Sequence, residues 1–338
     1  MELKQAYISH AICHRYSSDP TKSLINHQEV NLDEVNAEIL RKFFVNPFSN
    51  IKREYGFTHQ VDLAYNVIYQ ISLSVLNGMN FVEASINIFK HLNSVSDKPS
   101  IKDGDIFVCK IEDIEINGSY LEGLCVFKIE SKNQFIETNI NTQGQLDLST
   151  KIGFSTNKID KAALIVFTDK QPTVIVIDKS KDTKFWKDDF LGLALKNNNF
   201  SQTENAVRLI EGFISDELNN NNPISKEKRI QILNKGIELM KAKDSVNLSD
   251  IGRQIFEDPL VVEQFEAYRE AFEEHSNLTF QDSFAVDKTG LSTAKSIRRI
   301  RLDDNAEIYL LKTGTFIERG FDSTSNQYYY TLFFSREK

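Results

Sequence analysis

The segment TKFWKDDFLG, residues 183–192, holds an acidic pair beside an aromatic ring. Asp188 and Asp189 follow Trp186, which is the only tryptophan in the chain. Two neighbouring carboxylates beside an aromatic platform are one arrangement for acid–base catalysis. A lone tryptophan among other large apolar residues mostly packs inward, however, and carboxylates at such a point accept backbone N–H groups of a following turn or helix. We therefore expect Trp186 to lock the crossing between a sheet and the next helix, without a catalytic role.

A loose set of two acids and a lysine lies in the hairpin expected over residues 103–130. Its members are Asp105, Glu122 and Lys128. Metal-dependent nucleases use carboxylates to hold Mg²⁺ and a lysine to steady the attacking water. In the usual compact core an acid comes two residues before the lysine, whereas Lys128 comes before its acid. A solvated sheet face explains these charges as well, so a metal-dependent DNA nuclease is an alternative to a non-enzymatic protein.

Two histidines near the N-terminus, His10 and His14, flank Cys13. On a strand their side chains share a face but lie ~13 Å apart at ~3.3 Å per residue, which is too far to chelate one ion. A metal site needs three or four converging ligands, and the sequence suggests no third. The sequence also has no GxGxxG or GxxxxGK[ST] phosphate loop and no GxSxG elbow. We predict no metal, no cofactor and no catalytic residue.

The composition is that of a folded globular protein, with 41% hydrophobic and 26% charged residues in a chain of 338. The most apolar stretch, residues 162–167, is far below the ~20 residues that a membrane span needs. The N-terminus lacks the pattern of a signal peptide. Cys13, Cys109 and Cys125 are far apart in sequence, which fits reduced, buried thiols better than disulfides. We expect a cytoplasmic protein that does not contact a membrane.

The net charge of −8 bears on nucleic-acid binding, because an acidic chain attracts DNA only through a local basic surface. Residues 225–243 offer one, with six lysines and arginines against two glutamates, a local charge of +4. Residues 257–274 hold seven acidic residues against one arginine, a local charge of −6. The two segments could pair with each other, or the basic helix could face phosphates while the acidic one faces away.

A second basic segment, KSIRRIRL, spans residues 295–302. On a strand, Arg299 and Arg301 project from one face and Arg298 from the other. Arginines at this density can grip phosphate through paired hydrogen bonds. Two aspartates follow directly and weaken the local field. An edge strand kept soluble by its charges is the other explanation of this segment.

The spacing of apolar residues predicts blocks of helix and strand. An opening strand is expected over residues 5–14. The expected helices cover residues 32–44 with Asn31 as N-cap, 61–76, 81–92, 201–218 with Ser201 or Thr203 as N-cap, 225–243, 249–256 and 259–274. One antiparallel sheet is expected over about residues 100–180, with strands 105–116 and 120–131 around an Asn117-Gly118 turn, then 133–140, 145–154, 162–167 and 173–178. Short strands at 296–302, 307–313 and 328–334 end the chain.

The predicted fold class is α+β: N-terminal helices with a central antiparallel sheet, followed by a helical region and a C-terminal group of short strands. The polar run NNNNP at residues 219–223 is the clearest linker in the sequence. We expect a domain boundary near it. Residues 1–220 would then form an α+β domain with the antiparallel sheet, and residues 221–338 would form a helical region with C-terminal strands.

Several segments, taken in order, resemble the bacterial nucleoid-associated protein family of the NdpA/YejK type. They include GDIFVCKIEDIEINGSYLEGLCVFKIESKNQF, NKIDKAALIVF, KFWKDDFLGL, FSQTENAVRLIEGF, KSIRRIRLDDNAEIYL, IERGFD and YYYTLFF. The likeness covers nearly the whole chain and is sharpest at residues 157–167 and 183–205. The resemblance implies an intracellular protein recovered with the bacterial chromosome, with no assigned reaction or cofactor. It supplies no set of DNA-contacting residues.

We therefore expect a non-enzymatic nucleoid-associated protein, in the cytoplasm and on the nucleoid, that binds DNA with little sequence preference through local basic patches. One alternative is the metal-dependent nuclease. Another is an interaction module that reaches the nucleoid through a partner protein, with the acidic segment 257–274 as its docking surface. A homo-oligomer also stays open. The residues expected to contact DNA are Lys226, Lys228, Arg229, Lys235, Lys295, Arg298, Arg299 and Arg301.

Overall fold

The structure is a computed structural model that describes most of the chain. It covers residues 1–154, 159–168, 171–179, 184–221, 226–276, 278–292, 299–302, 306–309 and 316–333, with the backbone alone at 219–221, 226–227, 299–301, 309 and 316. The chain divides into two compact units, Met1–Lys196 and Asn197–Lys338. The boundary expected near residue 220 falls at the end of helix α4 (Asn199–Asn221).

A seven-stranded antiparallel sheet organises the first unit, with strand order β1-β3-β4-β7-β8-β2-β9. Its strands are β1 (Tyr7–Tyr16), β2 (Tyr55–Phe57), β3 (Gly104–Ile116), β4 (Ser119–Ile129), β7 (Lys161–Val166), β8 (Thr173–Asp178) and β9 (Leu193–Leu195). The combination of this sheet with helices confirms the predicted α+β class. The predicted opening strand and four of the predicted sheet strands are present as β1, β3, β4, β7 and β8.

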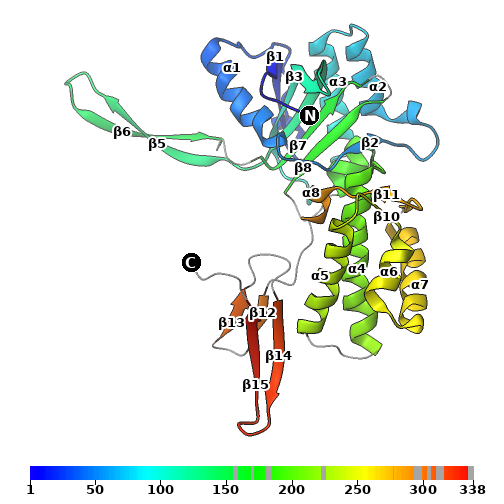
Figure 1. Cartoon of the computed structure of the whole chain (residues 1–338). Coiled ribbons are helices and arrows are strands. Elements are labelled where there is room, and N and C mark those ends of the chain that lie inside the picture. The colour runs from blue at the N-terminus through cyan, green and yellow to red at the C-terminus, as the bar shows by residue number, and fades with distance from the viewer. Residues whose placement is uncertain are drawn as a thin grey trace. The chain divides into compact units, whose positions relative to one another are not determined.

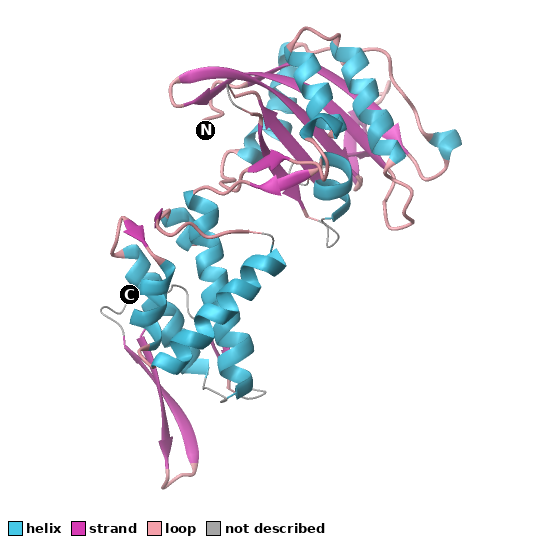
Figure 2. Ribbon diagram, turned by 90° about the vertical axis from the view of Figure 1, so that its right-hand side faces the viewer, coloured by secondary structure: helices cyan, strands magenta, loops and turns pink. Residues whose placement is uncertain are grey.

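Apolar layers cover both faces of this sheet (Figures 1 and 2). On one face lie α2 (Val67–Leu76), α3 (Phe81–Ser94) and a π-helical turn, Phe185–Leu191. On the other lie α1 (Glu34–Leu40) and the turns that continue it to Phe48. Successive residues of a strand point to opposite faces, so a sheet covered on both sides needs apolar residues at every position. All six residues of β7 are accordingly buried.

The longest hairpin of the sheet joins β3 and β4 through Asn117-Gly118, as predicted. Both turn residues have positive φ, 51° and 81°, which is the geometry that favours Asn-Gly in a tight hairpin turn. The register sets Cys109 opposite Cys125. Both are buried, free thiols, as the sequence predicts. Burial raises the pKa of each thiol.

Two lysines lie buried where the central strands meet the rim of the sheet. Lys128, with no exposed surface, donates through Nζ to the carbonyl of Lys102 and to Glu130, both at 2.6 Å. Lys161 pairs with Asp178, its cross-strand neighbour, at 3.0 Å. A buried charge is tolerated only when it is paired and hydrogen-bonded. These acids therefore stabilise the fold at the ends of β4 and β7.

Trp186 packs into the core of the first unit. Its side chain has no exposed surface, its ring centroid lies 4.8 Å from that of Phe190, and Nε1 donates to the carbonyl of Ala162. The prediction that Trp186 is a core residue is confirmed, and its role in locking the next helix stays a prediction. The carboxylate of Asp189 accepts a hydrogen bond from Nζ of Lys98 at 2.6 Å.

Asn66 joins the start of α2 to the end of the π-helical turn. Its Oδ1 accepts the N–H of Tyr69, which makes it the N-cap of α2. Its Nδ2 donates to the carbonyls of Thr58, Leu191 and Gly192. Gly192 adopts φ +61°, where a Cβ would lie 2.4 Å from Nδ2 of Asn66. One buried amide thus holds three segments together.

Three predicted helix starts are wrong. The N-cap of α1 is Asp33 and not Asn31, and α2 starts at Val67 and not near residue 61. A 3₁₀ turn occupies Leu63–Tyr65 instead, because the carboxylate of Asp62 accepts a backbone N–H there. At the start of α4 the amide oxygen of Asn198 accepts the N–H of Ser201. The N-cap is therefore Asn198, and not Ser201 or Thr203.

The predicted single sheet over residues 100–180 is wrong in one part. Strands β5 (Asn133–Ile140) and β6 (Leu146–Gly153) form a separate two-stranded hairpin. The reason is that β4 pairs directly with β7, so no edge of the sheet remains beside β4 for the intervening chain.

The second unit is a helical core with small sheets. Its helices are α4, α5 (Lys226–Lys241), α6 (Leu248–Phe256), α7 (Pro259–Ser276) and α8 (Lys288–Leu291). Its strands are β10 (Ser245–Val246), β11 (Phe284–Ala285), β12 (Arg299–Arg301), β13 (Glu307–Tyr309), β14 (Phe316–Asp322) and β15 (Gln327–Phe333), paired in sequence order. In α4 the apolar residues Val207, Ile210, Phe213 and Ile214 recur at helical spacing and are buried, and Phe213 packs against Phe256 and Phe265.

The Trp186→Ala substitution should lower the free energy of unfolding of the first unit by about 3–5 kcal/mol, because it leaves a large cavity under the sheet. Urea unfolding followed by circular dichroism would measure this. Tyr120→Ala, at a site where 62% of the residue is exposed, is the matched control and should change stability by less than about 0.5 kcal/mol. Equal effects of the two substitutions would contradict a core role for Trp186.

Candidate nucleic-acid interface

The basic helix predicted over residues 225–243 is present as α5. Ile230, Leu233, Ile237 and Met240 are buried and recur at helical spacing on one side of it. Lys228 and Lys235, seven residues apart, lie on the opposite side, roughly 10 Å from each other along the helix axis. The burial of one stripe therefore fixes the side of α5 on which these two lysines stand.

An apolar contact joins α5 to the small C-terminal sheets. Ile230 of α5 and Ile317 of β14 are both buried, and Ile308 of β13 and Tyr330 of β15 pack against them. Gln231 also donates to the carbonyl of Ile317. Since β13 pairs with β12, this contact links the helix to the strand that carries the second basic segment. The two predicted basic segments are thus connected within one unit.

The predicted DNA-contacting residues divide into three groups. Lys228 is exposed, Arg229 is half-buried, and the Lys235 side chain is 42% exposed. For Lys226, Arg299 and Arg301 the backbone alone is described, and the register of β12 sets Arg301 opposite Glu307. Lys295 and Arg298 lie outside the described residues. The DNA-binding role of all eight stays a prediction.

Lys235 contacts the acidic segment directly. Its Nζ forms a short ion pair with Glu257, which follows the last residue of α6, and also donates to the carbonyl of Ile255. The hydrogen bond from Lys235 is the main reason why the pKa of Glu257 lies below its ordinary value. Of the two arrangements that the sequence left open, the structure shows pairing at this position.

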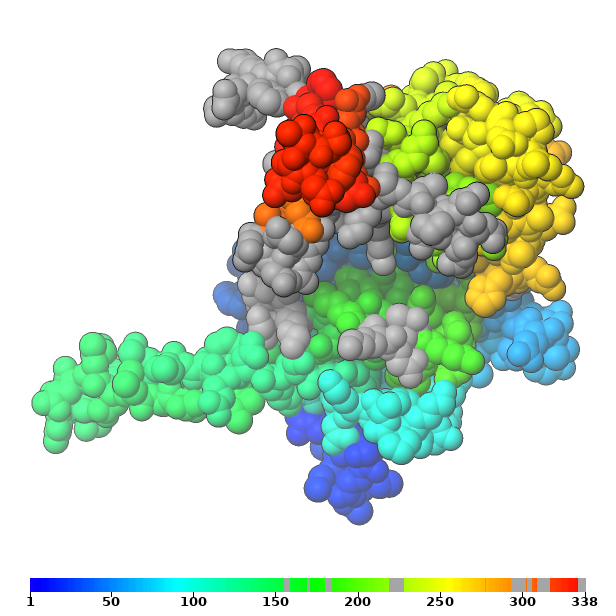
Figure 3. All heavy atoms as spheres, turned by 90° about the horizontal axis from the view of Figure 1, so that it is seen from below, coloured from blue at the N-terminus to red at the C-terminus, as the bar shows by residue number. Residues whose placement is uncertain are grey.

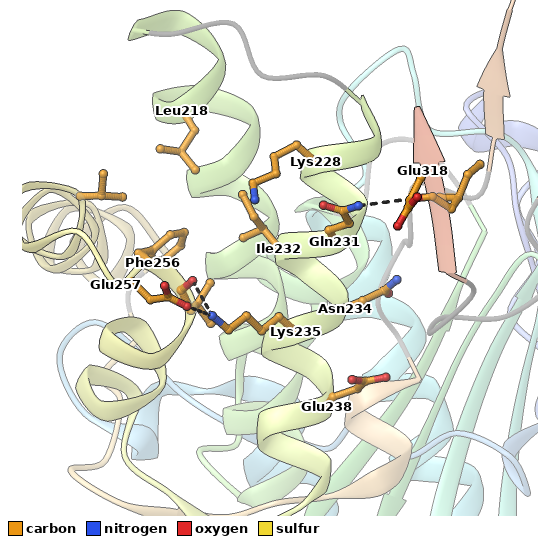
Figure 4. Close-up of a pocket in the computed structure, with 13 residues that line it drawn as sticks. Leu218, Lys228, Gln231, Ile232, Asn234, Lys235, Glu238, Phe256, Glu257 and Glu318 are labelled. Carbon is orange, nitrogen blue, oxygen red and sulfur yellow. Dashed lines mark hydrogen bonds and ion pairs between the residues drawn. The ribbon is translucent and has the colours of Figure 1, made fainter. Parts of the chain in front are cut away.

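A cavity of about 680 Å³ lies beside these lysines (Figure 4). Most of its polar lining comes from α5, with Lys228, Gln231, Asn234, Lys235 and Glu238, and two further acids come from Glu257 after α6 and Glu318 of β14. Apolar side chains of α4, α5, α6, α7 and β14 complete it. The cavity therefore mixes two cations with acids and apolar groups, which differs from the uniformly cationic surface that a phosphate backbone attracts.

The acidic helix α7 shows its charges in part to solvent. Glu263, Glu270 and Glu274 are exposed. Glu266 pairs with Arg269 at 3.1 Å, and Glu273 accepts the backbone N–H of Phe280. The acidic segment thus combines structural acids with an exposed row of glutamates.

The three residues considered for a nuclease do not gather. Asp105 lies near the start of β3 and accepts hydrogen bonds from Arg15 and Lys132, each at 2.7 Å. Lys128 pairs with Glu130, and Glu122 pairs with Lys110 at 3.0 Å. Glu122 and Lys128 are six residues apart on β4, roughly 20 Å at ~3.3 Å per residue. The geometry gives these three no common metal-binding point.

The two N-terminal histidines also have separate surroundings. His10 contacts Glu29 through Nδ1 at 2.8 Å. His14 is buried, its Nδ1 accepts the N–H of Asn26, and burial lowers its pKa to about 4. Within the described ranges, no group of three or more His, Cys, Asp or Glu side chains has the geometry of a metal site.

Sequence reasoning missed the contacts that shape this region. Glu257 was counted only as one acid of a charged run, and the role of Ile317 in holding β14 against α5 was not expected. The segment FIERGFD around Ile317 has no regular alternation of apolar and polar residues, so neither the strand nor its partner has a clear local signal.

A family model described as nucleoid-associated protein YejK matches residues 12–311. The chain belongs to the nucleoid-associated protein YejK family. The match includes both basic segments and all of the seven-stranded sheet except the first half of β1. No curated protein matches the chain. Among the helices that the structure describes, none has the length and apolar character to cross a membrane.

The Asp105→Asn substitution should lower the stability of the fold, because it removes the charge that binds Arg15 and Lys132. Burial raises the pKa of Asp105, but the hydrogen bonds from Arg15 and Lys132 outweigh it and hold the pKa below its ordinary value. We expect a loss of about 1.5–3 kcal/mol in unfolding free energy at pH 7, the scale of hydrogen bonds to charged groups. The carboxylate stabilises the fold above its unfolded pKa of about 3.9, so the difference from wild type should shrink as the pH falls below that value.

Chemical denaturation at a series of pH values measures this difference. Glu122→Gln is the matched control, because its side chain is 46% exposed and its surface pair is worth about 0–1 kcal/mol. A gap between Asp105→Asn and wild type that is unchanged at pH 3 would contradict the assignment.

Proposed function

We propose that this chain is a nucleoid-associated protein that binds duplex DNA directly and with little sequence preference. The observation that carries the proposal is the Ile230–Ile317 contact, with Ile308 packed against it, because it connects α5 to the β12–β13 sheet. Membership of the nucleoid-associated family supports the nucleoid as its location in the bacterial cytoplasm. The DNA-contacting groups are the cationic side chains of α5 and of residues 295–301.

The proposal requires a local basic surface, because the whole chain is acidic. The total charge is −8, whereas residues 225–243 carry a charge of +4. Within a Debye length of about 8–10 Å at physiological salt, a phosphate responds mainly to the nearest charges. Lys228 and Lys235 are roughly 10 Å apart along α5. Lys228 is the α5 cation that we expect to contact a phosphate in the wild-type protein, and Lys235 can reach a second one only when its pair with Glu257 opens.

Weak sequence preference follows from the same chemistry. Lysine and arginine contacts to phosphate position a protein on the duplex but carry no base information. Binding should release condensed counterions, so the affinity should fall steeply as salt rises. Duplexes of different sequence and equal length should bind alike.

Lys228→Glu tests the role of α5. We expect weaker binding to every duplex and a plot of log affinity against log salt whose slope is less steep by about 1 for the lost phosphate contact. Fluorescence anisotropy with a labelled duplex at several salt concentrations measures both. Lys90→Glu, at an exposed position of α3, is the control with the same change of charge. A flat salt dependence of the wild-type protein, or equal effects of the two variants, would overturn the proposal.

Glu257→Gln should strengthen binding, because it removes the carboxylate that pairs with Lys235. We expect the salt slope to become steeper by about 1 as the released ammonium gains a phosphate. Adding Lys235→Gln to the same protein should cancel this gain. If Glu257→Gln leaves both affinity and slope unchanged, Lys235 is not a phosphate contact.

Protein-mediated contact with the chromosome is the alternative that these assays separate. The exposed glutamates of α7 offer a surface that complements a basic partner. A purified chain that binds no duplex at low salt, yet stays with nucleoid proteins after nuclease treatment, would favour this alternative. Complete release by nuclease together with direct binding would favour the proposal.

A further inference from the structure

The β5–β6 hairpin, residues 133–153 and called the arm below, has one apolar face that nothing in the described structure covers. Figure 3 shows it projecting from the body of its unit (green). Ile136, Ile140, Leu146, Leu148 and Ile152 are 69–76% exposed. Large aliphatic side chains exposed singly are ordinary, but a contiguous patch of them marks an interaction site.

The strand register places these five side chains on the same face. Directly opposed residues of an antiparallel pair share a face, and the register pairs Ile140 with Leu146 and Thr138 with Leu148. Ile136 opposes Thr150 and Ile152 opposes Gln134. No residue of this face carries a charge.

The opposite face of the arm is polar except for Phe135, and its polar side chains bond to one another. Lys151 pairs with Glu137 at 2.6 Å, and Asn139 donates to Ser149 at 2.9 Å. Asn141 donates to Asp147 near the turn. The arm is therefore amphipathic: all the charged residues of its strands lie on the face opposite the aliphatic side chains, where they can stay in contact with water.

An isolated two-stranded hairpin is marginally stable in water and needs packing against its apolar face. Each strand of the arm has eight residues, about 26 Å at ~3.3 Å per residue. The arm pairs with no other strand among the residues described. The arm thus presents an elongated apolar face, and a partner that covers it must offer an uncharged surface of similar length.

We propose that the arm of a second copy of this chain covers this face, so that two arms pack face to face in a two-fold dimer. An interface about a two-fold axis uses one patch twice and needs no second surface. An uncharged aliphatic face meets this condition, since its own copy offers neither repulsion nor an unpaired charge. The charged residues then remain outside, and two hairpins stacked ~10 Å apart form a small sandwich.

The size of the patch indicates a reversible dimer. Burying one aliphatic side chain removes roughly 60–120 Å² from water, so the five side chains supply roughly 300–600 Å² per copy. Standard interfaces bury about 800 Å² per partner, and weak complexes less. We expect the dimer population to rise with protein concentration over the micromolar range.

The test uses the full chain and two neighbouring substitutions that add the same charge to opposite faces of the arm. Leu148→Lys places an ammonium group in the apolar face, and Ser149→Lys places one on the polar face. Sedimentation velocity over a dilution series should show wild type and Ser149→Lys moving from one chain of 38.8 kDa towards twice that mass. Leu148→Lys should raise the dimer dissociation constant by roughly 100-fold or more, because two-fold packing would bury both ammonium groups.

A second variant keeps the test independent of how one lysine is accommodated. Replacing residues 135–151 by a short turn removes the arm and should leave a chain that is monomeric at all concentrations, with the circular dichroism spectrum and melting temperature of the remaining fold retained. A wild-type chain that stays monomeric at high concentration would overturn the proposal and assign the face to a different partner. A dimer that persists in Leu148→Lys and in the arm-deleted chain would also overturn it. Neither result depends on DNA binding.

Discussion

Burial of the central strands on both faces is the constraint on which the first unit depends. Every residue of β7 and the last seven residues of β4 are buried, so the sheet requires an apolar layer on each side. The α2–α3 pair with the Trp186 turn supplies one layer, and α1 with its continuation supplies the other. Charge is then admissible only at strand ends and only with a partner, as for Lys128 and Lys161. The same rule turns Asp105 from a catalytic candidate into a residue that holds Arg15 and Lys132 in place.

In the second unit, helix α5 packs both into the helical core and against the C-terminal sheets. The buried stripe of α5 packs into the helical core, while Ile230 reaches the C-terminal sheets. Cationic residues occupy the positions that this packing leaves at the surface. Acids compete for these cations at the same surface, as the pair between Lys235 and Glu257 shows.

Local pattern allowed much of the fold to be predicted from the sequence. Alternation located β3, β4, β7 and β8, the Asn117-Gly118 pair located their longest turn, and helical spacing located the stripe of α4. The starts of α1, α2 and α4 were predicted wrongly because several nearby polar residues could cap each helix and the pattern does not choose between them. The placement of β5 and β6 was wrong because the deciding pairing, β4 with β7, is distant in sequence. The three-residue strands β2 and β9 have no pattern of their own, and the apolar face of the arm does not by itself say what covers it. For the site, charge density pointed to α5, whereas neither the Lys235–Glu257 pair nor the Ile230–Ile317 contact has a local signal, because each joins residues more than twenty positions apart.

The two thiols that face each other across β3 and β4, Cys109 and Cys125, can report how often the sheet opens. A thiol reacts as its thiolate, and burial disfavours that form for Cys109 and Cys125 while the sheet is closed. Alkylating reagents can then modify them only when the two strands part. The rate of labelling would report how often the centre of the sheet opens, a quantity that equilibrium melting does not resolve. Alkylation of Cys109 and Cys125 thus measures how often β3 and β4 separate.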